Sequence, residues 1–364
     1  MIEKRNILIS ILCIILLIGA SRVAAPEVRV YPHDISIAFE YDDNVTRERL
    51  KENFQYGIIS RLATGFGIKD FIPLKGLNTE IEYDLGLRDV NTTNDEDYSS
   101  QKLALSSDIK LKTGTLIFLR DEFKLWNSKS DLFNFYDNVV NIGASQLLVE
   151  GTTTDLLYEN RQKRFRNDVP EVQARNFLHH QVGVNMYHAL SSALTAQVGY
   201  AYRFIIYNRS PIDFSGDRVI ALDGSQKDRQ NIITLGFRGF FPNRKVTLRL
   251  QNQFVRSDSN SRAFDFDGNK VLIMLHVGPF WNLSANFTYR LVAYNLEAQQ
   301  TPETGYELTE PRSDDQSGIT FDLSYRVSDQ VLLELGYERV ENTVFFTREF
   351  YEENIFRTGL KVDF

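Results

Sequence analysis

The feature of the sequence that most constrains its fold is an alternation of apolar and polar residues that recurs along the chain. Residues 194–204 and 283–291 are the clearest segments, with an apolar or aromatic side chain at every second position. Because successive side chains of a β-strand point to opposite faces, each such segment predicts a strand with one apolar and one polar face. The pattern predicts an all-β chain of about sixteen strands, at residues 35–41, 56–62, 80–88, 103–111, 117–125, 139–149, 153–164, 182–187, 194–204, 233–241, 246–254, 271–277, 283–291, 319–326, 331–338 and 355–364.

The connections between these segments alternate in length. Long connections cover residues 43–53, 89–99, 127–138, 165–176, 207–228, 256–269, 296–315 and 346–353, and short ones lie between them. Residues 64–76 are the exception, a long connection where a short one is expected. A soluble β-sandwich or propeller also alternates along its strands, but its connections do not sort by length in this way. The alternation therefore favours an antiparallel up-and-down barrel, with the short turns at one end and the long loops at the other.

The last ten residues are an amphipathic strand that ends on an aromatic residue. Arg357, Gly359, Val362 and Phe364 resemble the assembly signal at the end of bacterial outer-membrane β-barrels. The resemblance implies a transmembrane antiparallel up-and-down β-barrel with short periplasmic turns and long extracellular loops. It also implies that the barrel-assembly machinery recognises this strand through Gly359, Val362 and Phe364. The alternative is the edge strand of a soluble sheet that ends on Phe.

The first 25 residues read as a secretory signal peptide. Lys4 and Arg5 precede an apolar run at 7–18, and small residues between Ala20 and Ala25 offer a cleavage site. Cys13, the only cysteine, lies inside the apolar run. We therefore expect residues 26–364 to form a single barrel domain without a cysteine, which excludes disulfides, iron–sulfur clusters, thiolate zinc sites and covalent c-type haem. No cofactor is expected.

Charge and aromatic content agree with a membrane barrel. The formal net charge of -7 argues against a nucleic-acid partner, which requires a basic surface. Aromatic residues at strand ends fit the interfacial girdles of a membrane barrel: Tyr41, Tyr56, Trp126, Tyr158, Phe204, Phe241, Trp281 and Tyr325.

A barrel of about sixteen strands leaves an aqueous lumen unless something fills it, and no plug domain separates the signal peptide from the first strand. The expected function is passive diffusion of ions or small hydrophilic solutes across the outer membrane of a Gram-negative bacterium. Expected partners are membrane lipids, lipopolysaccharide, the barrel-assembly machinery and those solutes, and the barrels can associate as homo-oligomers. The predicted pore-lining residues are the charged residues of the polar faces: Glu80, Glu82, Asp84, Arg120, Lys124, Arg203, Arg238, Arg249, Arg290, Asp322, Arg326, Glu334, Arg357 and Lys361.

Two details of the lumen stay open at this stage. Facing rows of opposite charge would create a transverse field that orients solutes, whereas paired charges would only satisfy a polar interior. The loop at 207–228 either folds inward as a constriction or packs on itself outside.

Three other functions are weighed against the channel. Residues 39–45 resemble the opening of putative outer-membrane β-barrel porin families found near exopolysaccharide-export genes, which implies polysaccharide export. A sheath around a partner electron-transfer protein would take its haem from another chain. A barrel enzyme would use His179 or His180 with a carboxylate such as Asp168 or Glu171, but the spacing matches no catalytic motif, so we expect no enzyme.

Overall fold

The computed structural model describes residues 29–43, 57–72, 76–91, 97–128, 134–167, 173–215, 218–241, 245–261, 265–296, 317–342 and 351–363. The predicted signal peptide and Phe364 lie outside these ranges. No helix within them is long and apolar enough to span a bilayer.

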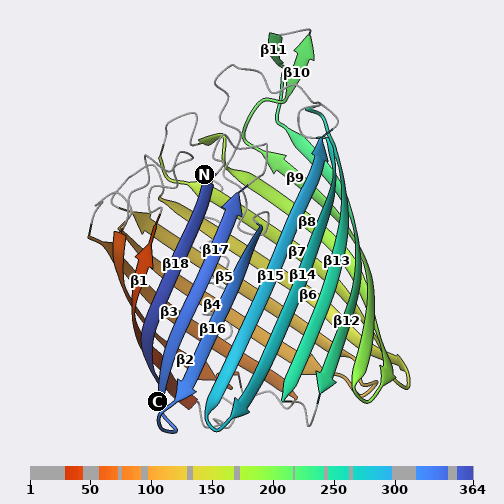
Figure 1. The fold of residues 1–364 in the computed structure, drawn as a ribbon. Coiled ribbons are helices and arrows are strands. Elements are labelled where there is room, and N and C mark those ends of the chain that lie inside the picture. The colour runs from red at the N-terminus through yellow and green to blue at the C-terminus, as the bar shows by residue number, and fades with distance from the viewer. Residues whose placement is uncertain are drawn as a thin grey trace.

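Sixteen antiparallel strands form one closed barrel (Figure 1). This confirms the prediction of an all-β, up-and-down barrel. Even β16, the shortest strand of the barrel, has 10 residues, within the range of about 9–11 that a tilted strand needs to cross a bilayer. The barrel strands are β1 (Arg29–Asp42), β2 (Gly57–Lys69), β3 (Leu77–Val90), β4 (Tyr98–Lys110), β5 (Leu116–Ser128), β6 (Phe135–Val149), β7 (Thr152–Phe165), β8 (Phe177–Ser191), β9 (Leu194–Tyr207), β12 (Lys227–Phe241), β13 (Val246–Ser259), β14 (Phe266–Phe280), β15 (Leu283–Leu296), β16 (Ser317–Arg326), β17 (Val331–Asn342) and β18 (Tyr351–Asp363).

The barrel closes where the first strand meets the last. β1 pairs with β18, and Glu40 stands opposite Arg357 in this register. On its other side, β18 forms a hairpin with β17. The terminal strand therefore has a partner on each edge, so the barrel leaves no open edge for pairing with another chain.

The loop at 207–228 extends away from the barrel. It contains a two-stranded hairpin of β10 (Ile212–Ser215) and β11 (Arg218–Ala221). Figure 1 shows this hairpin beyond the long-loop end of the barrel, not inside it. Of the two possibilities weighed from the sequence, the inward constriction is therefore wrong for this hairpin.

Residues 64–69 of the long connection expected at 64–76 belong to strand β2. β2 continues to Lys69, and Gly65 pairs with Asp84 inside the sheet. A Cβ at Gly65 would lie 2.9 Å from the backbone oxygen of Tyr83, so a larger residue does not fit. Gly65 thus lies where the inner face of the strand is crowded.

Each barrel strand has one apolar and one polar face. Ile37 and Phe39 are 46% and 53% exposed, whereas Glu40 and Asp42, on the opposite face of β1, are 2% and 0% exposed. The outer surface of a closed single-sheet barrel cannot bury side chains this completely, so these carboxylates point into the barrel. The exposed apolar face therefore points outward, as a lipid-facing surface requires.

Trp126 departs from its predicted place, whereas Asp121 interrupts the apolar face of its strand, as the sequence pattern indicates. Trp126 was predicted to be a girdle residue, but it shares the inner face of β5 with Lys124 and stacks on Tyr98 from β4, with ring centroids 3.6 Å apart. Asp121 lies on the outer face between Leu119 and Phe123, and Asn138 Nδ2 donates a hydrogen bond to its Oδ1 over 3.3 Å. The sequence pattern identifies this interruption but not the amide that satisfies it.

Candidate functional site

The inner wall of the barrel is the candidate functional site. All fourteen residues predicted to line the pore lie on the same face of their strands as Glu40, because the strand registers connect them around the closed barrel. The alternation along each strand was therefore sufficient to assign their side. It did not show which of them contact one another.

The strongest cluster lies at the seam between β1 and β18. Glu40 Oε2 is 2.8 Å from Arg61 Nη2, and Arg357 Nε donates to Glu40 Oε1 over 2.6 Å. Arg357 also lies 3.8 Å from Glu338 Oε2 on β17. A buried carboxylate held by two guanidinium groups is stabilised by short charge-assisted hydrogen bonds. This seam cluster, consisting of Glu40, Arg61, Arg357 and Glu338, joins four neighbouring strands.

Asp42 and Asp43, at the end of β1, form further polar contacts with neighbouring strands. Arg88 Nη2 is 4.0 Å from Asp42 Oδ2. Asp43 accepts hydrogen bonds from the backbone nitrogen and the side-chain amide of Asn354, at 2.7 and 2.8 Å. Glu40 and Asp43, two of the residues that carried the resemblance to export-associated porins, therefore connect the first strand to the last.

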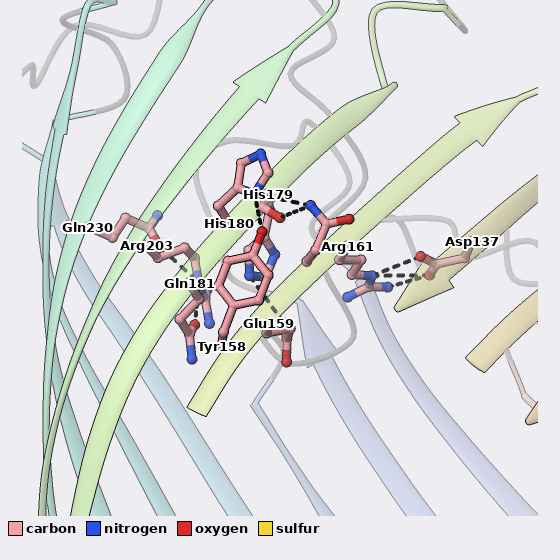
Figure 2. A network of polar contacts seen from close by, with 10 residues as sticks. Asp137, Tyr158, Glu159, Arg161, His179, His180, Gln181, Arg203 and Gln230 are labelled. Carbon is pink, nitrogen blue, oxygen red and sulfur yellow. Dashed lines mark hydrogen bonds and ion pairs between the residues drawn. The ribbon is translucent and has the colours of Figure 1, made fainter. Parts of the chain in front are cut away.

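A second network crosses β6 to β12 (Figure 2). Arg161 binds Asp137 through Nε and Nη2, with Nη2 2.6 Å from Oδ2. His179, which is fully buried, lies 3.1 Å from Glu159 Oε1. Arg203 donates to Gln181 over 2.8 Å. These contacts link side chains of adjacent strands on one wall, so the pairing is lateral and does not cross the lumen.

The two adjacent histidines point to opposite faces. His180 is outward, where its Nδ1 lies 2.9 Å from Tyr158 Oη and 3.1 Å from Asn160 Nδ2. The inward His179 has Glu159 as its carboxylate neighbour. The loop carboxylates Asp168 and Glu171, weighed as its partners from the sequence, lie outside the described residues. The observed pair connects β7 to β8, and no pattern in the sequence indicates it beyond the shared inner face.

Aromatic rings and cations alternate along the inner wall near the long-loop end. Trp126 stacks on Tyr98 and lies 5.8 Å from Phe135, and Phe135 lies 5.5 Å from Phe165. Lys163 Nζ sits 4.1 Å from the centre of Phe135 and 4.9 Å from that of Phe165. Because the ring faces contact one another or a cation, this aromatic ladder stiffens the wall and does not offer open faces to a solute.

Other predicted lining residues are held in smaller contacts. Lys102 pairs with Asp84 at 2.7 Å, and Lys69 pairs with Glu80 at 3.1 Å. Lys361 pairs with Asp363 at 3.5 Å. The guanidinium of Arg120 lies over the ring of Phe118. Asp322 and Glu334 belong to no ion pair within the described ranges.

The base of the outer hairpin is tied to the rim of the barrel. Arg209 donates to Gln226 over 2.7 Å, and Gln226 donates to Asp228, which also accepts from the hydroxyl of Ser259. Burial lowers the pKa of the Arg209 guanidinium, and nearby Tyr207 and Asp228 act in the opposite direction. The network fixes the loop against β12 and β13.

Within the described part of the chain, no group of three or more His, Cys, Asp or Glu side chains is placed to hold a metal ion.

No protein-family model and no curated protein matches the sequence. Solved structures similar to this chain include a bacterial polysaccharide outer membrane secretin, at 6% identity over 91% of this chain and 98% of that chain, with a TM-score of 0.46. OmpT, an outer membrane protein of Vibrio cholerae, is 9% identical over 95% and 100% of the two chains, with a TM-score of 0.46. A triple mutant of the Rhodopseudomonas blastica porin is 11% identical over 93% and 100%, with a TM-score of 0.39. These likenesses concern the fold and carry no information about what this chain transports or binds.

Proposed function

We propose that this protein is an outer-membrane channel of a Gram-negative bacterium for passive diffusion of ions or small hydrophilic solutes. The observation that supports the proposal is the division of faces in a closed sixteen-stranded barrel. Its outer face exposes apolar side chains such as Phe39 and Leu335, at 53% and 55%. Its inner face carries the fourteen charged residues predicted to line the pore. A barrel of this size encloses an aqueous channel.

The lateral pairing of the wall charges is consistent with this function. If the carboxylates and cations paired across the lumen, they would obstruct it. Glu40, Asp84 and Asp137 instead bind cations on adjacent strands. Ions and solutes would then pass along this part of the wall, where neighbouring charges compensate one another.

The test is liposome swelling with the purified full chain, using uncharged sugars of increasing size. A diffusion channel predicts fast swelling with small sugars and a cut-off at larger ones. Swelling no faster than in protein-free liposomes would contradict the channel and leave the barrel fold unaffected. Heat-modifiable migration on detergent gels verifies that the inserted protein is folded.

We further propose that residues 1–25 are removed during export and that Gly359, Val362 and Phe364 are read by the barrel-assembly machinery. Gly359 supports this role through its environment. A Cβ there would lie 3.2 Å from the backbone oxygen of Ile37 and 3.3 Å from the Cβ of Ala38. A side chain at this position would therefore fit tightly against β1 at the closing seam, while Val362 faces outward.

A further inference from the structure

The charges of the inner wall are unevenly distributed around the barrel. On β16 to β18 and β1 to β7, basic and acidic side chains are interleaved, and several of them form ion pairs, as at Glu40, Asp84 and Asp137. On the inner faces of β8 to β15, Asp228 is the only acidic residue among the described ones, and it lies at the long-loop end of β12. The same faces carry five basic residues: Arg203, Arg238, Arg249, Lys270 and Arg290. This cationic wall occupies one side of the lumen.

Within the cationic wall, two arginines stand directly opposite each other. Arg238 on β12 and Arg249 on β13 are register partners on the inner face. Side chains so placed have Cβ atoms about 4.5–5.5 Å apart, and like charges at this spacing repel each other. Both side chains are exposed. Two arginines so placed destabilise the barrel unless a negatively charged group contacts both guanidinium groups.

The protein contacts of the two arginines do not supply that negative charge. Arg249 Nη2 donates to Gln251 Oε1 over 2.6 Å, and the Arg238 guanidinium lies 4.7 Å from the ring centre of Phe240. Neither arginine forms an ion pair with any described residue. Arg61 and Arg357 differ in this respect, because both form an ion pair with Glu40.

The surroundings of the arginine pair add neutral donors. Thr195 on β9 is the register partner of Arg238, and Thr247 lies two residues before Arg249 on the same face. Two guanidinium forks flanked by hydroxyl groups match the oxygens of a carboxylate or phosphate, which accept several charge-assisted hydrogen bonds at once. The position, three residues from the short-turn ends of β12 and β13, is at one mouth of the lumen.

We infer that Arg238 and Arg249 form a binding station for small oxyanions, such as inorganic phosphate or a carboxylate, at the short-turn mouth of the lumen. The inference rests on the proposed channel and names its class of solute. The cationic wall attracts anions into the lumen, and the arginine pair holds them transiently before release. A weak station at the mouth raises the local anion concentration without blocking passage.

The binding arm of the test uses the detergent-solubilised full chain and inorganic phosphate, measured by titration calorimetry. Arg238→Gln and Arg249→Gln should each weaken phosphate binding about tenfold, the effect of losing one charged hydrogen-bonding partner. Arg249→Lys keeps the charge but not the fork, so its loss should be smaller. Lys110→Gln is the matched control, because Lys110 is an exposed cation at the same end of the barrel on the opposite wall. All variants must show the heat-modifiable band of a folded barrel.

The conductance arm measures the reversal potential in planar bilayers under a potassium chloride gradient. The wild type should prefer chloride, and Arg238→Gln should shift the potential toward potassium more than Lys110→Gln does. If the barrel binds phosphate, loses this binding in Arg238→Gln and yet conducts no ions, the oxyanion-binding station is supported and the channel is contradicted. A conducting barrel with no phosphate binding, or equal losses in Arg238→Gln and Lys110→Gln, would overturn the station and leave the channel standing.

Discussion

The seam cluster predicts that Glu40 contributes more to barrel stability than any ordinary wall carboxylate. Its side chain is completely buried, and it binds Arg61 and Arg357, each with 35% side-chain exposure. Glu40→Gln removes the charge that compensates both guanidinium groups and keeps the shape of the side chain. Breaking a buried ion pair costs about 3–5 kcal/mol. Because both arginines reach lumen water, we expect a loss of about 2–3 kcal/mol in the free energy of unfolding.

The assay is reversible guanidinium unfolding of the barrel in lipid vesicles, followed by intrinsic fluorescence. The control is Glu334→Gln, which removes an inner-wall carboxylate on β17 whose described contacts include no ion pair. Its loss should stay within about 0.5 kcal/mol. Equal unfolding midpoints for Glu40→Gln and Glu334→Gln would refute the reasoning that the seam depends on this carboxylate.

Three further changes test other parts of the structure. Deleting Phe364 should lower the amount of folded protein in the outer membrane, scored by heat-modifiability, without altering the conductance of molecules that do assemble; normal assembly would exclude Phe364 from the signal. Gly143→Ala should destabilise the barrel by about 1–3 kcal/mol, because its Cβ would lie 2.7 Å from the backbone oxygen of Leu156; Gly183→Ala, whose nearest contact is 3.2 Å, should cost less in the same unfolding assay. Asp121→Leu should stabilise the barrel in lipid by about 1 kcal/mol, since it removes a carboxyl from the outer face; a loss of stability would mean that its bond to Asn138 outweighs the cost of exposure.

The strands of this barrel could be predicted from the sequence because alternate residues of a membrane-barrel strand face lipid and water, and are apolar and polar accordingly. Segments such as 283–291 carry the signal directly. The pattern also assigned every predicted lining residue to its face. The prediction from this pattern was wrong at Gly65 and Trp126, where packing inside the barrel determines which residue fits. A glycine in a crowded strand resembles a turn, and an inner-wall aromatic resembles a girdle residue.

The contacts of the wall required the three-dimensional register. Glu40 and Arg357 are separated by almost the whole chain, and no local pattern pairs them. The pair of Arg238 and Arg249 likewise depends on which residues of β12 and β13 face each other. The sequence showed a mixture of charges, whereas the register shows that one wall is balanced and the other is cationic.

The central claim is that alternate residues of each strand face water and lipid, and thiol accessibility tests it most directly. Thr320 and its neighbour Phe321 on β16 lie on the inner and outer faces, and Phe321 is 44% exposed. Each is replaced by Cys in a chain whose only native cysteine, Cys13, lies in the predicted signal peptide. In proteoliposomes, a charged thiol reagent should modify Thr320→Cys rapidly and leave Phe321→Cys unmodified. Modification of Phe321→Cys but not of Thr320→Cys, or equal modification of both, would contradict the water-filled lumen and lipid-facing exterior.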